Sequence, residues 1–213
     1  MARPQLARLM LIKAVSSMET EKPFSQACEN NKRVILSVLE RAFANCHQVL
    51  EIGSGTGQHA VFLAEYLPHL IWHTSDQPHY HEGIAAWLSD SNTRNVKPPI
   101  AFTVGQDDFP NLDIDGIFTA NTAHIMQKEE VKLLMESVAL HLPKGGVFCQ
   151  YGPFTHSGKF TSESNQAFHT SLLARGYGGY RDINELTAWA GELSLQDIID
   201  MPANNHMLIW QKR

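Results

Sequence analysis

Short apolar runs alternate along the chain with segments of helical spacing. The runs are rich in β-branched residues and fall at 48–53, 70–76, 99–104, 115–121, 146–152, 194–201 and 206–212. Between them, residues 29–43, 57–67 and 128–142 repeat apolar side chains every three or four positions, as one buried helix face requires. This alternation predicts βαβ units and a largely parallel sheet.

The last two apolar runs differ from the others because no helical segment separates them. Only "PANN" (202–205) marks their boundary, and Pro and Asn are common turn residues. We therefore expect these runs to form an antiparallel hairpin. The predicted fold is an α/β three-layer sandwich with a mostly parallel seven-stranded sheet that ends in this antiparallel C-terminal hairpin strand.

The composition is that of an ordinary globular protein, with 43% hydrophobic and 18% charged residues. The formal net charge is −5, which argues against the basic footprint of a nucleic-acid-binding protein, so we expect no nucleic-acid partner. No apolar run approaches the roughly 18 residues of a membrane span. The widely spaced Cys28, Cys46 and Cys149 fit reduced thiols in a cytoplasmic protein.

Residues 1–22 are the least typical part of the chain. Three basic residues precede the first acid, Glu19, and Lys13 interrupts the apolar stretch, whereas a signal peptide has a longer unbroken core. Met18 offers a second start. We assign 1–22 as an N-terminal extension and 23–213 as one domain. Residues 1–17 are either an extension without a role in the fold or a further helix.

The string "VLEIGSGTGQH" (49–59) carries the first chemical signal. It reads as a strand that ends in a glycine turn and opens a helix, which brings backbone N–H groups and a helix N-terminus to one point. A dinucleotide-binding loop has the spacing G-x-G-x-x-G, but here the third position is Gln58 and Gly57 comes one residue early. An NAD-dependent oxidoreductase is therefore disfavoured.

The G-x-G-x-G spacing with Glu51 two residues earlier resembles the S-adenosylmethionine (SAM) loop of class I methyltransferases. The next strand ends in Asp76, whose carboxylate can accept hydrogen bonds from both ribose hydroxyls. Asp76 can instead be the N-cap of a following helix. The fourth strand ends near Asn121 and His124, where an open α/β sheet places ligands.

Longer strings narrow this resemblance. The chain from about Phe24 to its C-terminus resembles the methyltransferase-like family that includes methyltransferase-like protein 26, through "VLEIGSGTGQHAVFLA", "TANTAHI", "YGPFTHSGKFTSESNQAF", "YRD" and "MPANN". The resemblance implies a Rossmann-like class I methyltransferase fold with SAM as cofactor, S-adenosylhomocysteine (SAH) as product and a small-molecule acceptor.

Site residues follow from the positions that match. The expected cofactor-binding residues are Glu51, Gly53, Ser54, Gly55, Gly57, Gln58, His59, Asp76, Thr103, Val104 and Asn121. Thr103 departs from the family pattern, which usually has an aspartate at the end of the third strand, where class I enzymes contact adenine. Gln106 or Asp107 is the candidate substitute.

The acceptor pocket is expected beyond the ends of the fourth and fifth strands. The candidate catalytic residues are His124, Tyr151 and Arg181, with His124 the first choice as proton acceptor because its ordinary pKa is near neutral. The candidate substrate-binding residues are Asn31, Asn165, Asn204 and Asn205. Each has a structural alternative: a helix cap for His124, a buried strand aromatic for Tyr151, an ion pair for Arg181 and turn positions for Asn204 and Asn205.

Two other chemistries find little support. His69, His73, His79 and His81 cluster in sequence, but no carboxylate stands at a recognised zinc spacing, so no metal is expected. "GSGTG" is not the G-x-S-x-G motif of a hydrolase, since its central residue is Gly55. The sequence thus favours a SAM-dependent methyltransferase. The main alternative is a non-catalytic SAM-binding sensor or partner-binding module.

Overall fold

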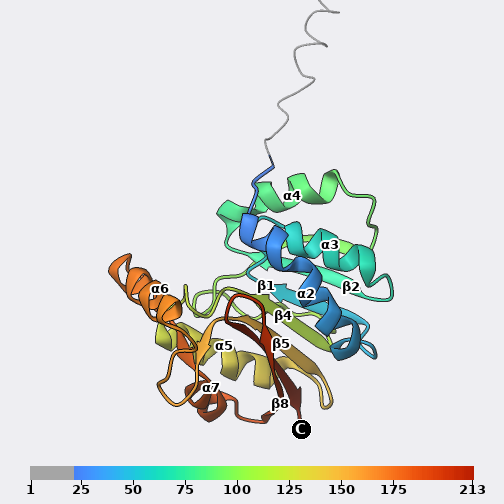
Figure 1. Ribbon diagram of the computed structural model, residues 1–213. Helices are drawn as coiled ribbons and strands as arrows, with labels where there is room; N and C mark the ends of the chain where they lie inside the picture. Colours follow the sequence, from blue (N-terminus) through green and yellow to red (C-terminus); the bar gives the residue numbers. More distant parts are fainter. Residues whose placement is uncertain (1–21) are drawn as a thin grey trace, which may run out of the picture.

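A seven-stranded sheet with the strand order β3-β2-β1-β4-β5-β9-β8 runs through the computed structural model, which describes residues 22–213 (Figure 1). Strands β1 to β5 pair with parallel neighbours, and β9 pairs antiparallel with both β5 and β8. The predicted fold class and the C-terminal hairpin are therefore confirmed. The strands are β1 (Gln48–Ile52), β2 (Ile71–Asp76), β3 (Val96–Ala101), β4 (Gly116–Ala120), β5 (Val147–Gly152), β6 (Phe154–Thr155), β7 (Arg181–Asp182), β8 (Leu193–Met201) and β9 (Asn205–Lys212).

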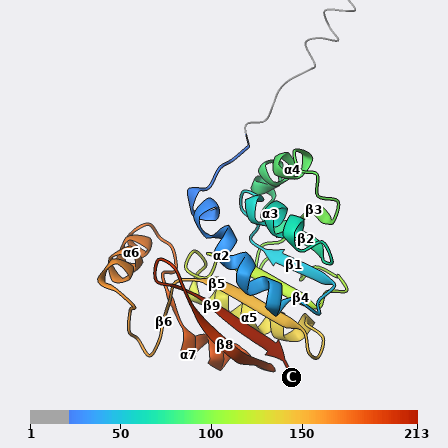
Figure 2. The same cartoon turned by 45° about the vertical axis from the view of Figure 1, so that its right-hand side comes forward.

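Helices cover both faces of this sheet (Figures 1 and 2). On one face, α2 and α3 bury residues such as Leu39 and Leu63 against Trp72 and Phe118. On the other face, α5 and α7 pack against Phe148 and Trp210. The two apolar layers enclose the sheet, as the alternating pattern requires. The helices are α2 (Gln26–Ala42), α3 (Gln58–Tyr66), η1 (Pro78–Tyr80), α4 (His81–Ser89), α5 (Lys128–His141), α6 (Glu163–Ala174) and α7 (Ile183–Trp189).

One strand lies three residues away from its predicted position. The apolar run at 99–104 suggested the third strand there, but β3 spans Val96–Ala101 and includes Pro98 and Pro99. Proline cannot donate a backbone hydrogen bond, so it is tolerated in a strand mainly at the edge of a sheet, and β3 is the edge strand. Thr103 therefore lies in the loop beyond β3.

The strand order reverses between β1 and β4, which are neighbours although they are not consecutive in the chain. In open α/β sheets, ligands bind outside the carboxyl ends of the strands at such a point. The loops that follow β1 and β4 are 53–57 and 121–127, so the fold places the glycine turn beside Asn121 and His124. Residues 1–21 lie outside the described residues, and the assignment of an N-terminal extension stays a prediction.

Candidate functional site

The glycine turn after β1 is tied to the end of β2 by backbone hydrogen bonds. The N–H groups of Gly53 and Ser54 both donate to the Ser75 carbonyl at 3.0 Å, and the Gly55 N–H donates to Asp76 Oδ2 at 2.7 Å. The other carboxylate oxygen of Asp76 accepts the Gln77 N–H at 2.7 Å. The turn and the acidic residue therefore form one rigid unit at the switch point of the sheet.

Two glycines of this turn serve different purposes. Gly57 has φ 88°, and a Cβ there would lie 3.1 Å from Ile84 Cα, so this glycine lets α3 approach α4 closely. Gly55 has φ 56°, but a Cβ there would meet no atom within 4 Å. The backbone at Gly55 therefore faces open space, where a ligand can lie against the main chain.

Gly55 lines a cleft of about 450 Å³. This cleft is bounded by the glycine turn and by the loops that follow β2, β3 and β4. Six of the eleven expected cofactor-binding residues line it: Gly53, Gly55, Asp76, Thr103, Val104 and Asn121. Phe102, Ile125 and Met126 add an apolar wall. The cleft thus combines bare backbone, one buried carboxylate and apolar side chains.

The five other expected cofactor-binding residues do not line this cleft; they are Glu51, Ser54, Gly57, Gln58 and His59. Glu51 is buried and accepts a hydrogen bond from Trp72 Nε1 at 3.1 Å, and burial raises its pKa to about 7. Ser54 Oγ accepts the Ser75 N–H at 3.2 Å. Glu51 and Ser54 therefore support the glycine turn from the protein interior.

Gln58 and His59, at the start of α3, bind the beginning of α2. Gln58 Oε1 accepts the Ser25 N–H at 2.5 Å, and Ser25 in turn caps α2 by accepting the Cys28 N–H at 3.3 Å. His59 Nε2 lies 2.7 Å from Asn31 Oδ1. The first turns of α2 are therefore held over the helix that opens from the glycine loop.

Thr103 lines the cleft from the loop beyond β3. Its N–H donates to Asp107 Oδ2 at 2.7 Å. Asp107 was a candidate to replace the family's adenine-contacting aspartate, but its carboxylate closes this loop instead. Neither Gln106 nor Asp107 lines the cleft.

A second cavity of about 490 Å³ adjoins the first. Asn121 lines both, and it adopts a left-handed conformation with φ 58° while its N–H donates to the Tyr151 carbonyl at 2.9 Å. Five further predicted residues line the second cavity: Asn31, His124, Tyr151, Asn165 and Asn205. They come from α2, the loop after β4, β5, α6 and the start of β9, so the fold brings together residues that are far apart in the sequence.

His124 is buried, and its ring makes no hydrogen bond within residues 22–213. Its ring centroid lies 5.9 Å from that of Phe168 and 6.2 Å from that of Tyr180. Burial lowers the pKa of His124 to about 4. The imidazole is therefore neutral at pH 7 and has a ring nitrogen free to accept a proton.

Tyr151 is the second titratable group in this cavity. Burial raises the pKa of its hydroxyl, and a hydrogen bond to Asn31 opposes that shift. The chain Tyr151–Asn31–His59 thus links the cavity to the helix behind the glycine loop.

Arg181 and Asn204 do not line the cavity. Arg181 is buried, and its guanidinium donates to the carbonyls of Gly178 and Gly179. The backbone carbonyl of Asn204 accepts a hydrogen bond from Asn165 Nδ2 at 3.0 Å, so Asn204 positions a lining residue without being one.

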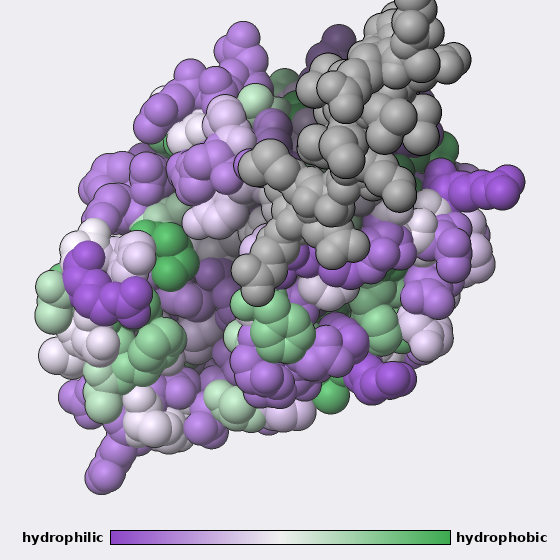
Figure 3. Space-filling view, turned by 90° about the horizontal axis from the view of Figure 1, so that it is seen from above, coloured by the Kyte–Doolittle hydropathy of each residue, from purple (hydrophilic) through white to green (hydrophobic). Residues whose placement is uncertain are grey.

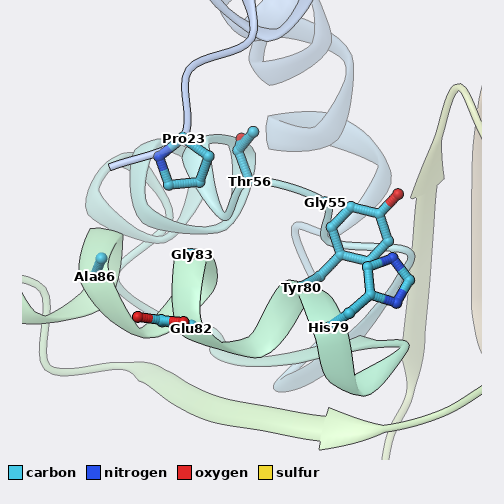
Figure 4. Close-up of a pocket in the computed structure, with 8 residues that line it drawn as sticks. All are labelled: Pro23, Gly55, Thr56, His79, Tyr80, Glu82, Gly83 and Ala86. Carbon is cyan, nitrogen blue, oxygen red and sulfur yellow. The ribbon is translucent and has the colours of Figure 1, made fainter. Parts of the chain in front are cut away.

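A third hollow, of about 440 Å³, adjoins the first cleft, with which it shares Gly55 and Tyr80 (Figure 4). Figure 4 shows Pro23 facing Gly83 and Ala86 of α4 across this hollow. The Pro23 carbonyl accepts the Trp87 Nε1–H at 2.7 Å. The segment 22–25 therefore lies beside the cleft as a strap between α4 and α2.

Sequence reasoning missed several lining residues, and most have no chemical signal. Met126, Gly176 and Tyr177 line the first cleft, and Asn30, Phe168 and Tyr180 line the second cavity. Asn30 is the one that had a signal, because its neighbour Asn31 was predicted and both lie in the first turns of α2.

The face of the molecule in Figure 3 shows hydrophobic residues only in separate patches among hydrophilic ones.

Within residues 22–213, no group of three or more His, Cys, Asp or Glu side chains gathers in a way that could hold a metal ion. In the same part of the chain, none of the helices combines the length and apolarity that crossing a bilayer requires.

Residues 22–212 match the family described as "Protein of unknown function (DUF938)". The chain belongs to this family. The match covers nearly all of the described residues, including every residue that lines the two cavities.

Solved structures similar to this DUF938 protein include methyltransferases. Human N-acetylserotonin methyltransferase in complex with SAM aligns with a TM-score of 0.74 at 15% identity over 99% of this chain and 57% of that one. An O-methyltransferase family 2 protein from Planctomyces limnophilus in complex with apigenin gives 0.70 at 18% identity over 86% and 62%. PigF with SAH gives 0.71 at 17% identity over 84% and 61%.

The DUF938 chain thus spans about three fifths of the length of these proteins. At such low identity the likeness shows the fold, which is that of the class I methyltransferase domain.

Proposed function

We propose that this protein is a SAM-dependent methyltransferase that acts on a small molecule. The observation that carries the proposal is the pair of adjoining cavities that share Asn121. One of them presents bare glycine backbone and a carboxylate, and the other presents a neutral histidine. A group-transfer enzyme needs two ligands side by side, and this arrangement supplies two sites in contact.

The first cavity fits SAM. Asp76 has a further lone pair on each carboxylate oxygen beyond the two backbone N–H groups it binds, so it can accept the ribose hydroxyls. Phe102 and Val104 supply apolar contacts for adenine, and Gly55, where a Cβ would meet no atom within 4 Å, leaves room for the methionine part. Similar solved structures hold SAM or SAH, which supports this assignment.

SAM supplies the methyl group: its carbon bonds to the acceptor atom, the sulfur keeps the electrons of the broken bond, and the acceptor loses a proton. His124 is the proposed proton acceptor because it lines the second cavity and its ring nitrogens have no partner within residues 22–213. Burial lowers its pKa to about 4, so it is a weaker base than the near-neutral imidazole that the sequence suggested. It then passes the proton to solvent. Tyr151, Asn31, Asn165 and Asn205 are proposed to orient the acceptor. Arg181 has no part in this proposal, since backbone carbonyls occupy its guanidinium.

The resemblance to the family of methyltransferase-like protein 26 belongs to the same proposal. Two of the strings that carry it, 151–168 and 201–205, contribute Tyr151, Asn165, Phe168 and Asn205 to the second cavity. A shared acceptor site would explain why these strings are alike.

The first test is a calorimetric titration of the protein with SAM and with SAH. We expect both to bind, and the absence of binding at millimolar concentration would refute the proposal. The second test incubates the protein with SAM that carries an isotope-labelled methyl group and with a metabolite extract. Labelled small molecules that disappear with His124→Ala would support an enzyme. SAH binding without any transfer would favour the non-catalytic SAM-binding module.

A further inference from the structure

The second cavity has an uncharged lining. Among its lining residues in the described part of the chain, none is Asp, Glu, Lys or Arg, although 18% of all residues are charged. Five charged residues adjoin lining residues in the sequence without lining the cavity: Glu29, Lys32, Arg33, Glu163 and Arg181. Glu29 and Lys32 bind one another at 2.6 Å, and the Arg181 guanidinium donates to backbone carbonyls. A charged ligand in this cavity would lose hydration without gaining an ionic partner.

Two carboxamides of the lining are fixed as hydrogen-bond acceptors. Asn165 Nδ2 donates to the Thr161 hydroxyl at 2.8 Å and to the Asn204 carbonyl at 3.0 Å, which uses both of its hydrogens. Asn205 Nδ2 donates to the carbonyls of Pro202 and Ala203 at 3.0 and 3.4 Å. A carbonyl can only accept, so the amide nitrogens must point to these partners.

The Oδ1 atoms of Asn165 and Asn205 therefore remain as acceptors, and neither receives a donor from residues 22–213. Both residues line the cavity, so a donor that enters the cavity can reach these oxygens. Together with the unpaired ring of His124, these oxygens favour a ligand that donates hydrogen bonds.

Rings form another wall of the cavity. His124, Phe168 and Tyr180 have mutual centroid distances of 5.9 to 6.2 Å and lie edge to face or tilted. Phe168 is 43% exposed, an unusual fraction for a phenylalanine that packs against two other rings. A flat ring placed against Phe168 would bury this surface and gain aromatic contacts.

We infer that the second cavity binds an uncharged molecule that has a flat ring and at least one hydroxyl group, and that it discriminates against carboxylates, phosphates and ammonium groups. This inference deepens the proposed function, on which it rests for the identity of the neighbouring ligand. The inference itself concerns only which molecules bind in the second cavity, and binding can be measured without catalysis.

The experiment uses ligand-observed NMR with the full-length protein saturated with SAH. The probes are 2-naphthol, 6-hydroxy-2-naphthoate and 6-(aminomethyl)-2-naphthol, which share ring and hydroxyl but carry no charge, a negative charge and a positive charge. Three further sets, built on indole, quinoline and coumarin rings, each contain a neutral, a negatively charged and a positively charged hydroxylated member. We expect the neutral members to bind at least about tenfold more tightly than their charged partners, which corresponds to about 1.4 kcal/mol.

A variant tests whether the probes bind in this cavity. Asn30 lines the cavity from the exposed side of α2, so Asn30→Asp adds one negative charge at almost constant shape and without burying it. We expect the ammonium members to gain affinity in this variant. Gln166→Glu is the matched control, because it adds the same charge at an exposed position of α6 outside the lining. It should leave all affinities unchanged.

The outcomes separate the inference from the proposed function. If SAH binds but no neutral member binds, or charged members bind equally well, the inference is wrong and the methyltransferase proposal stands. If SAH does not bind, the proposed function fails, and the probes still report the preference of the cavity in the protein alone. If Asn30→Asp and Gln166→Glu change the affinities equally, the probes bind elsewhere and the inference is overturned.

Discussion

At the residue scale, Asp76 has both a structural role in the glycine turn and a proposed role in binding the ribose of SAM. Its carboxylate holds the glycine turn through Gly55 and lines the space where a ribose would lie. Asp76→Asn should weaken SAH binding about ten- to a hundredfold, since hydrogen bonds to a charged group contribute roughly 1.5–3 kcal/mol. Calorimetry measures this change. Asp108→Asn, an exposed carboxylate outside the cleft, is the control. Equal losses in both variants would contradict the assignment of Asp76.

The two glycines of the turn make a second prediction. Gly55→Ala should lower the free energy of unfolding by about 1–2 kcal/mol, the cost of a left-handed backbone for alanine, because nothing obstructs the new methyl. Gly57→Ala carries a similar backbone cost and also meets the Ile84 backbone, so its loss should be larger. Urea denaturation compares the two. The affinity for SAH should fall more in Gly55→Ala than in Gly57→Ala, since Gly55 lines the cleft and Gly57 does not.

The buried histidines make acid stability a third prediction. His124 and His59 each have a pKa lowered to about 4, below the ordinary value of 6.5, because burial disfavours the charged ring. The unfolded chain therefore binds more protons between pH 6.5 and 4. Stability should fall as the pH decreases through this window, by at most about 1.4 kcal/mol per pH unit for each histidine.

His124→Gln removes one of these titrating groups and should make the fall in stability between pH 6.5 and 4 shallower. Denaturation curves at a series of pH values measure the slope. His156→Gln is the control, because His156 is exposed and its ring makes no hydrogen bond within residues 22–213. An unchanged slope in His124→Gln would mean that His124 is already protonated, or solvated, in the folded protein.

The sequence predicted residues that line the first cleft where chemistry and backbone position coincide. Asp76 ends a strand, and Gly53, Gly55 and Asn121 follow strand ends, which in parallel strands meet at one edge of a sheet. The sequence was a poor guide where the direction of a side chain decides whether the residue lines a cavity. Glu51 lies within β1 and points into the protein, and Arg181 turns back to its neighbouring carbonyls. No periodicity in the sequence specifies those directions.

At the scale of elements, the long periodic helices and the C-terminal hairpin were predictable, because burial imposes their patterns. The walls of the second cavity were not. Helix α6 has few buried residues, Asn165 and Leu172, so its sequence lacks an apolar stripe that would place it. The strap 22–25 has no period at all, and hydrogen bonds from Trp87 and to Gln58 position it.

The strap provides the element-scale prediction. A Cβ at Gly83 of α4 would lie 2.5 Å from Pro23 Cγ. Gly83→Ala should strengthen the helix by up to about 1 kcal/mol while pushing the strap away. We expect faster amide exchange at Ser25, whose N–H donates to Gln58, and unchanged exchange in β1. Ala85→Gly, two residues along α4, should weaken the helix and leave Ser25 protected. Slow exchange at Ser25 in Gly83→Ala would show that the strap does not rest on α4.

At the scale of the whole molecule, one sheet lies between the two apolar layers. Leu50 and Val49 are consecutive residues of β1, yet they belong to opposite layers. Neither layer can lose its packing without exposing the same strands, so we expect residues 22–213 to unfold as one cooperative unit.

The last prediction concerns residues 1–17, which precede the second methionine. The family match begins at residue 22, and α2, the first described helix, is capped by Ser25 and held by Gln58. The contacts described for the two cavities lie within residues 22–213. A chain that starts at Met18 should unfold in a single transition at the same melting temperature as the full chain and bind SAH equally well. Calorimetric unfolding and titration compare the two chains directly. A melting temperature lower by several degrees would instead mean that residues 1–17 pack onto the domain, because a lost contact of about 1 kcal/mol shifts a domain of this size by roughly 2–4 °C.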